Sequence, residues 1–124
     1  YLKLPVVYAR KKKPVTMPSE VYITVAPSHT KGINTELIVS PEYLDRGEKV
    51  LIIDDFLASG QTIAGLVRLA EVAGAEIVGI GTLVEKTFEG GRDLLTPLGV
   101  PIHSLVSISS LDDGKIEFTD EFAV

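Results

Sequence analysis

Two adjacent carboxylates followed by a turn of small residues form the part of the chain best suited to chemistry. Asp54 and Asp55 come directly after the apolar run 50–53, and the small-residue turn 58–62 follows them. Consecutive backbone N–H groups in such a turn, at the start of a helix, suit a phosphate group. Gly60 permits a positive φ or a close approach of the ligand to the backbone. This stretch is therefore a candidate phosphate-binding site.

The side chains of this stretch indicate what would accompany the phosphate. Ser59 and Thr62 add hydroxyl donors to the turn. Asp54 and Asp55 would repel a phosphate placed directly on them, but they can accept hydrogen bonds from sugar hydroxyls or help to hold Mg²⁺. The structural alternative is a solvated strand end followed by an ordinary helix cap. A ribose 5-phosphate needs both halves of the stretch, and both are present.

The elements around this stretch predict an α/β fold. Val50-Leu51-Ile52-Ile53 is a continuous apolar run, typical of a strand that is covered on both faces in a parallel sheet. Apolar residues then recur with the i, i+3, i+4, i+7 spacing of an amphipathic helix, which Gly74 ends; they are Ile63, Leu66, Val67 and Ala70. Further strands are expected over 77–84 and 104–108, a short helix over 92–98, and an edge strand over 115–118. Together they predict an open, mainly parallel sheet with flanking helices.

The first third of the chain predicts a hairpin. Residues 20–26 alternate, with Val21, Ile23 and Val25 on one side and Tyr22 and Thr24 on the other, as in a half-buried strand. A second short strand is expected over 36–40. The polar segment 27–34 between them, which contains Lys31, is expected to be a flexible loop.

A basic run, Arg10-Lys11-Lys12-Lys13, follows the β-prone residues 6–9, and Pro14 keeps it out of a helix. The chain carries 12 lysine and arginine residues against 17 acidic ones, a net charge of −5. Without the basic run 8 cations would face 17 anions, so the run stands out on an acidic surface. The bland interpretation of such a run is a solvated loop.

Composition excludes several classes of protein. The length of 124 residues, with 45% hydrophobic and 23% charged residues, is that of one globular domain spanning 1–124. The acidic balance argues against a nucleic-acid partner. There is no cysteine, which excludes a disulfide scaffold and a thiolate site, and two histidines are too few for a histidine-built metal centre. No apolar run approaches the ~18 residues of a membrane span.

The stretch around the acid pair resembles the phosphoribosyl-diphosphate-binding motif of type I phosphoribosyltransferases, and it is closer still to bacterial xanthine phosphoribosyltransferases. The segments that carry the resemblance are Asp54 to Gln61, Val84-Glu85-Lys86, Gly91-Arg92-Asp93 and Ser109-Ser110-Leu111. It extends from about Pro5 to the C-terminus. The family often has asparagine where this chain has Ser59, and both residues are small and polar.

The resemblance implies roles for particular residues. The turn Ala58, Ser59, Gly60, Gln61 and Thr62 would hold the 5′-phosphate, and Asp54 and Asp55 would contact the ribose hydroxyls as the catalytic acids. Lys86 would lie beside the purine and donate to an exocyclic oxygen. Arg10 and Lys11 would reach the diphosphate, in the same subunit or in a neighbouring one. Lys31 would lie in the mobile loop of the family.

The reaction implied is transfer of phosphoribosyl from 5-phospho-α-D-ribose 1-diphosphate to xanthine, in purine salvage. Mg²⁺ would bind mainly through the substrate, with no protein metal site. A cytoplasmic homodimer without nucleic-acid or membrane partners is expected. The family's first strand-helix unit, with its diphosphate loop, would precede Val6, so the chain is expected to be N-terminally truncated and inactive by itself.

Two other classes of protein stay open at this point. A regulatory domain of the same fold could sense phosphoribosyl diphosphate without catalysis, and an attached helix-turn-helix would distinguish it. A phosphoacceptor signalling domain also groups acids at strand ends around Mg²⁺. It needs a further aspartate at the end of another strand, whereas 78–84 is followed by Glu85-Lys86.

Overall fold

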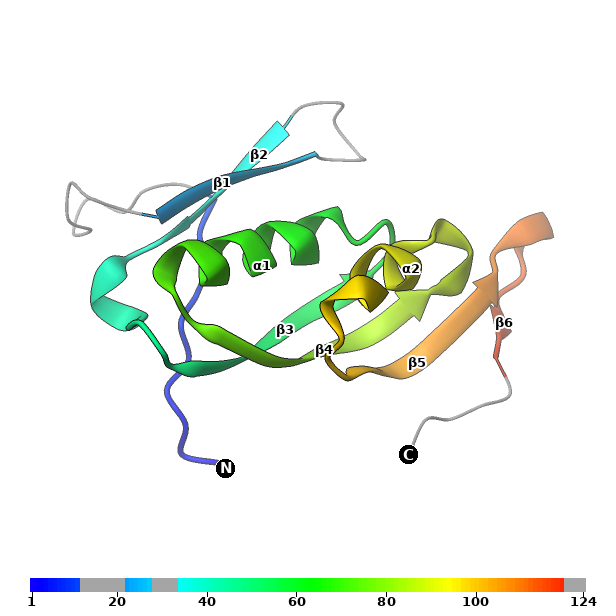
Figure 1. Cartoon of the computed structure of the whole chain (residues 1–124). Coiled ribbons are helices and arrows are strands. Elements are labelled where there is room, and N and C mark those ends of the chain that lie inside the picture. The colour runs from blue at the N-terminus through cyan, green and yellow to red at the C-terminus, as the bar shows by residue number, and fades with distance from the viewer. Residues whose placement is uncertain (12–21, 28–33, 120–124) are drawn as a thin grey trace.

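A four-stranded sheet forms the base of the protein. The computed structural model describes residues 1–11, 22–27 and 34–119. Strands β3 (Lys49–Leu57), β4 (Glu76–Lys86) and β5 (Ile102–Ser110) are parallel neighbours, and β6 (Glu117–Phe118) adds antiparallel to β5 at one edge. The expected open, mainly parallel sheet is therefore confirmed (Figure 1).

Two helical crossovers connect the parallel strands. Helix α1 (Gln61–Ala73) joins β3 to β4, and α2 (Gly91–Leu95) joins β4 to β5 between the 3₁₀ turns η2 (Thr87–Glu89) and η3 (Thr96–Leu98). The helix expected over 92–98 is thus split, because Pro97 lies in the turn η3 and cannot continue the hydrogen bonding of an α-helix. None of the helices within the described ranges is long and apolar enough to cross a membrane.

Helix α1 has the boundaries and the buried face that its sequence period predicts. Gly74 adopts φ 76° after its last residue, and its N–H closes the final turn onto Ala70 and Glu71. The apolar stripe of α1 packs on the sheet in a core with α2. The buried members of this core are Ile52, Leu57, Ile63, Val67, Ile80 and Leu95.

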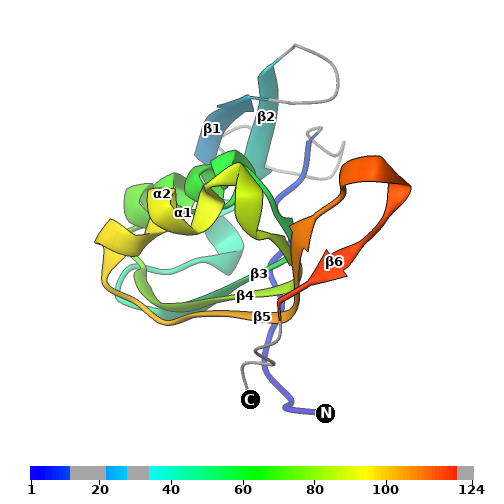
Figure 2. The same cartoon turned by 90° about the vertical axis from the view of Figure 1, so that its right-hand side faces the viewer.

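The expectation that the apolar run 50–53 is covered on both faces is wrong for the described residues. Leu51 and Ile53 are 59% and 64% exposed, and Leu83 of β4 and Leu105 of β5 are also exposed. The reason is that α1 and α2 both lie over the same face of the sheet (Figure 2). Among the described residues, only that face is covered by helices.

The predicted hairpin is present on the other side of α1. Strands β1 (Tyr22–Pro27) and β2 (Asn34–Val39) pair antiparallel, so that α1 lies between the hairpin and the large sheet. Ala26 is buried and Tyr22 and Thr24 are half-buried, whereas Ile23 and Val25 are 51% and 46% exposed. The strand therefore turns the side with Tyr22, Thr24 and Ala26 toward α1, and not the side with Ile23 and Val25. Loop residues 28–33, including Lys31, lie outside the described residues.

The close approach of the hairpin to the backbone of α1 at Gly65 explains which side of β1 faces the helix. A Cβ on Gly65 of α1 would come within 2.9 Å of Leu37 Cδ1 and 3.4 Å of Ala26 Cβ. Arg68 then fastens the helix to β1, because its Nε donates to Thr24 Oγ1 at 3.0 Å and its Nη2 to the carbonyl oxygen of Val25 at 2.8 Å. The hairpin therefore packs closely on α1 at Gly65 and is hydrogen-bonded to α1 through Arg68.

The β-prone residues 6–9 do not form a strand. Val6 and Tyr8 are exposed, and within residues 1–11 pairing with β2 is confined to Arg10, whose N–H and carbonyl exchange two 2.8 Å hydrogen bonds with Ile38. The β propensity of residues 6–9 is therefore followed by a single bridge to β2, at Arg10, and not by a strand.

Candidate active site

The acid pair lies at the carboxyl end of β3, although inside the strand, which continues to Leu57. The backbone N–H of Asp55 donates to Asp54 Oδ1 at 2.9 Å, and that of Phe56 donates to Asp55 Oδ1 at 2.8 Å. These contacts hold each carboxylate in place through one oxygen. The other oxygen of each side chain can accept a hydrogen bond from a ligand.

The two carboxylates have different environments. Asp54 is half-buried and Asp55 is exposed. Burial is the main cause that raises the pKa of Asp54 above 3.8. The hydrogen bond from the backbone N–H of Asp55 lowers the pKa, while the Asp55 carboxylate raises it. The cation of Lys11 acts in the opposite direction and lowers it. Lys11 is the member of the basic run whose charge acts on the acid pair among the described residues.

This environment predicts that Asp54→Asn stabilises the protein at neutral pH. Because the pKa is higher in the folded state than in the unfolded one, ionised Asp54 lowers the free energy of unfolding at pH values above both pKa values. The gain in Tm should be largest at neutral pH and should disappear well below pH 3.8, where the carboxyl is protonated in both states. Thermal melting at a series of pH values measures this, and a lower Tm at pH 7 would contradict it.

The small-residue turn leads into α1 as the phosphate interpretation requires. Gly60 has φ 82°, precedes the first residue of α1 and accepts from the N–H of Ala64 at 2.8 Å. It has no side chain that could cap the N–H groups at the start of this 13-residue helix. Those N–H groups, with the positive end of the helix dipole, favour an anion. Half-buried Ser59 and exposed Thr62 flank this point.

Lys86 lies at the same edge of the sheet as the acid pair. It ends β4, whose residues Val84 and Glu85 pair with Phe56 and Leu57 of β3. Its Nζ lies 5.7 Å from the centre of the Phe56 ring. The Nζ also lies 3.8 Å from Glu89 Oε2, with both side chains about one-third exposed. The predicted base-side lysine and the predicted sugar-side acids are therefore on adjacent strands.

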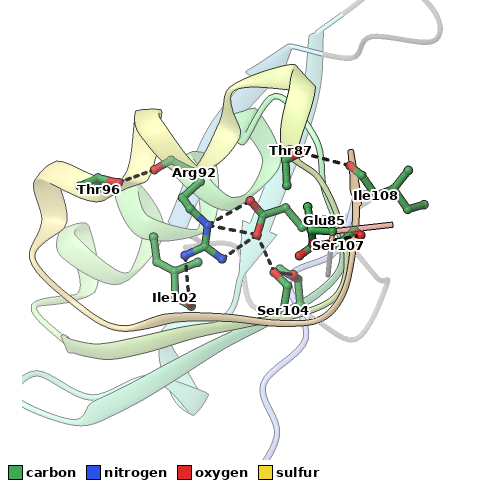
Figure 3. Close-up of polar contacts among 10 residues, drawn as sticks. Glu85, Thr87, Arg92, Thr96, Ile102, Ser104, Ser107 and Ile108 are labelled. Atoms are coloured by element: carbon green, nitrogen blue, oxygen red, sulfur yellow. Dashed lines mark hydrogen bonds and ion pairs between the residues drawn. The ribbon is translucent and has the colours of Figure 1, made fainter. Parts of the chain in front are cut away.

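An ion pair between buried Glu85 and the partly exposed Arg92, whose side chain is 43% exposed, lies next to Lys86 and was not predicted from the sequence. Glu85 is 2% exposed and accepts from the Nε of Arg92 at 3.0 and 3.1 Å and from its Nη2 at 2.6 Å (Figure 3). Ser104 donates to Glu85 Oε1 at 2.9 Å and contacts Thr82 Oγ1 at 2.7 Å. The ion pair also raises the pKa of Arg92. A glutamate at the end of an apolar strand, seven residues before an arginine, was the available signal.

The remaining predicted groups are less concentrated at this edge. Arg10 is fixed to β2 through its backbone, and Lys12, Lys13 and Lys31 fall outside the described residues. A surface hollow of about 370 Å³ lies at the far end of α1, beside Leu44 and Gly74, away from the acid pair. The candidate site thus lies on an open edge of the sheet, and its residues do not line the hollow.

The carboxylates offer few metal donors by themselves. In the part of the chain that the structure describes, no three acidic or histidine side chains gather closely enough to hold a metal ion. The donor set is the pair Asp54 and Asp55. Such a pair fits Mg²⁺ only where substrate phosphate oxygens and water complete the coordination.

The acid pair on one parallel strand, the uncapped helix start after it and the lysine that ends the next strand lie at the carboxyl edge of the sheet, where open α/β sheets bind ligands. They form a candidate site for a sugar phosphate. The family model of the phosphoribosyl transferase domain matches residues 1–117, and the chain belongs to this family. The membership confirms the predicted resemblance and the fold class.

Curated relatives and solved structures agree with this assignment. The chain is 45% identical over 120 residues to a xanthine phosphoribosyltransferase of Listeria innocua, covering 97% of this chain and 62% of the relative. It is 50% identical over 113 residues to that of Deinococcus deserti, covering 91% and 58%. The chain therefore spans about three-fifths of the length of these relatives.

Two solved structures share the fold. The adenine phosphoribosyltransferase of Rhodothermus marinus has a TM-score of 0.69 at 33% identity, covering 82% of this chain and 55% of that one. The enzyme of Trypanosoma brucei, in complex with AMP, pyrophosphate and ribose-5-phosphate, has a TM-score of 0.64 at 27% identity, covering 82% and 45%.

Proposed function

We propose that the whole protein containing this chain is a xanthine phosphoribosyltransferase of purine salvage. It would convert xanthine and 5-phospho-α-D-ribose 1-diphosphate into xanthosine 5′-monophosphate and diphosphate. The observation that carries this proposal is the adjacency of the acid pair, the uncapped helix start and Lys86 at one sheet edge. The curated relatives named xanthine phosphoribosyltransferase support the choice of base.

The turn 58–62 would bind the 5′-phosphate through backbone N–H groups at the start of α1, with Ser59 and Thr62 as further donors. Ribose-5-phosphate in the Trypanosoma brucei relative is a ligand of the chemistry this turn suits. Asp54 and Asp55 would then accept from the 2′- and 3′-hydroxyls of the ribose. Their charge also stabilises the positive charge that develops on the sugar.

Lys86 would select the base. An ammonium group donates hydrogen bonds and cannot accept them, which suits an exocyclic oxygen of an oxopurine and not the amino group of adenine. Release from Glu89, a weak and partly exposed contact, would let the side chain reach the base. The turn after Lys86 places the half-exposed aromatic ring of Phe88 at the same edge.

The chemical step needs positioning and charge more than covalent catalysis. A purine nitrogen forms the bond to C1′ while the bond from C1′ to the diphosphate oxygen breaks, and diphosphate leaves with the electron pair. Bound through the diphosphate beside Asp54 and Asp55, Mg²⁺ would neutralise charge on the leaving group. Lys11, whose charge lowers the pKa of Asp54, would approach the same leaving group. Arg10 would contribute from the edge of β2, in the same subunit or across a homodimer.

Replacement of Lys86 tests the assignment of the base site. Lys86→Ala in the whole protein should raise the KM for xanthine by roughly tenfold to a hundredfold, the range for losing a hydrogen bond from a charged group. The KM for phosphoribosyl diphosphate should change much less. Steady-state kinetics with each substrate varied in turn separates the two effects. Lys49→Ala, at the opposite end of β3, is the control, and equal effects of Lys86→Ala on both KM values would refute the assignment.

The 124-residue chain by itself is expected to release no measurable diphosphate. In this proposal the turn 58–62 binds the 5′-phosphate, and no backbone donors among the described residues are assigned to the leaving diphosphate. Losing even one donor at developing negative charge costs about 2.7–4 kcal/mol in other enzymes. A diphosphate-release assay with xanthine, phosphoribosyl diphosphate and Mg²⁺ measures this. Turnover within about tenfold of the whole protein would contradict the expectation.

A sensing domain of the same fold is the alternative. It would bind phosphoribosyl diphosphate without turning it over, whereas the proposed enzyme forms xanthosine 5′-monophosphate. Chromatographic detection of that nucleotide, in a reaction of the whole protein with both substrates, decides between the two. Binding without nucleotide formation from any purine base would favour the sensor.

A further inference from the structure

Gly91, at the start of α2, lies directly against the phosphate turn. Its N–H donates to the carbonyl oxygen of Ala58 at 2.9 Å. A Cβ at Gly91 would lie within 2.3 Å of that oxygen and within 2.8 Å of the backbone nitrogen of Gly60. A Cβ at Gly60 would in turn come within 3.0 Å of Gly91 Cα. The two backbones touch with no room for a side chain on either.

Position 91 requires glycine because there is no space for a side chain, and not because of its backbone conformation. Its neighbour Gly90 has φ 79°, and a Cβ there would meet nothing within 4 Å. Gly91 does not have such a positive φ, so alanine could adopt its backbone conformation. The two adjacent glycines therefore serve different needs, left-handed conformation at 90 and close approach at 91.

Helix α2 cannot easily move away from the turn. Arg92, the next residue, is fixed to the buried Glu85 by three hydrogen bonds from its Nε and Nη2 (Figure 3). Its Nη1 also donates to the carbonyl oxygen of Ile102 at 3.0 Å. These contacts attach α2 to both β4 and β5. Closely packed backbones of this kind transmit strain instead of absorbing it.

We infer that Gly91 is a positioning residue for the 5′-phosphate turn, and that the Glu85–Arg92 ion pair holds it there. This inference rests on the proposed function. The N–H of Gly91 fixes the carbonyl of Ala58, and this orients the following peptide groups toward the phosphate. Glu85 directly precedes Lys86, and Arg92 directly follows Gly91. The ion pair between Glu85 and Arg92 therefore links the phosphate turn to the base side of the site.

A Cβ at position 91 must therefore displace the turn. Leu57 Cδ1, at 2.8 Å, is the end of a side chain, but the backbone oxygen of Ala58 and the backbone nitrogen of Gly60 cannot rotate away as a side-chain end could. A displaced turn presents its N–H groups to the phosphate at poorer distances and angles. Binding of the phosphoribosyl group should weaken while the base side, which depends on Lys86, keeps its affinity.

The test compares Gly91→Ala with Gly90→Ala in the whole protein. Calorimetry with ribose 5-phosphate as the probe, together with steady-state kinetics, gives Kd, both KM values and kcat. Gly91→Ala should raise the Kd for ribose 5-phosphate and the KM for phosphoribosyl diphosphate by roughly tenfold or more, since small misplacements at a site have effects of this size. The KM for xanthine should stay within about twofold. Gly90→Ala should lower the Tm and leave the ratio of the two KM values unchanged.

Either of two results overturns the inference: a Gly91→Ala protein that binds ribose 5-phosphate as tightly as wild type, or Gly90→Ala weakening that binding equally. If Gly91→Ala does not fold, Glu85→Gln decides, because it keeps shape and acceptor but removes the charge that holds Arg92. It should raise the Kd for ribose 5-phosphate several-fold, and an unchanged Kd refutes the role of the ion pair. A wild-type protein that neither binds ribose 5-phosphate nor forms nucleotide refutes the proposed function itself.

Discussion

Replacement of Asp55 by asparagine is expected to lower kcat/KM of the whole protein by roughly tenfold to more than a hundredfold. The substitution keeps the size of the side chain and an oxygen that can accept from the N–H of Phe56. It removes the negative charge that would accept from a ribose hydroxyl and face the positively charged sugar in the transition state. Steady-state kinetics with both substrates near saturation separates this loss from a change in binding.

The matched control for Asp55→Asn is Asp45→Asn. Asp45 is also an exposed aspartate, but it lies beside the hollow at the far end of α1. Equal thermal stability of the two variants would show that the loss of rate is not a folding defect. Wild-type kinetics of Asp55→Asn would refute the assignment of the acid pair to the ribose.

Removal of the Arg92 side chain should lower the free energy of unfolding by about 1.5–3 kcal/mol, the range for a hydrogen bond to a charged group, because Glu85 is buried but the Arg92 side chain is itself 43% exposed. Glu85 is 2% exposed and would keep only the hydrogen bond from Ser104. The variant Arg92→Ala therefore leaves a buried carboxylate without its cation. Urea unfolding followed by circular dichroism measures the loss.

Arg68→Ala is the control for this experiment. Arg68 also makes two hydrogen bonds between α1 and a neighbouring strand, but it is exposed, so its loss should cost about 1 kcal/mol. Adding Glu85→Gln to Arg92→Ala should recover part of the stability, because no charge is then left buried. A loss from Arg92→Ala no larger than that from Arg68→Ala would contradict a stabilising role of the pair.

The elements that obey a local period were predictable from the sequence. The i, i+3, i+4, i+7 spacing of apolar residues predicted the position of α1, and Gly74 predicted its end, because both signals are local to the helix. The acid pair and Gly60 also followed from the chain alone, since turn chemistry and strand ends are local features. Residues 54–62 are the part of the candidate site whose local structure was predicted most completely.

Features that depend on distant neighbours were not predictable in the same way. The apolar run 50–53 predicted a strand that is covered on both faces of the sheet. Both helices lie on one face, however, and this leaves Ile53 exposed. The partner of Glu85 is seven residues away and meets it only because α2 folds back over β4. The effect of Lys11 on Asp54 joins segments more than 40 residues apart. Such contacts belong to the tertiary structure.

The central claim is that residues 54–62 bind the phosphoribosyl group, and one titration tests it most directly. Isothermal titration of the whole protein with phosphoribosyl diphosphate and Mg²⁺, followed by each purine base, measures both halves of the site. We expect stoichiometric binding of phosphoribosyl diphosphate, loss of most of that affinity in Asp55→Asn, and a preference for xanthine over adenine. Undiminished binding of phosphoribosyl diphosphate by Asp55→Asn, or no binding by the wild-type protein, would contradict the account.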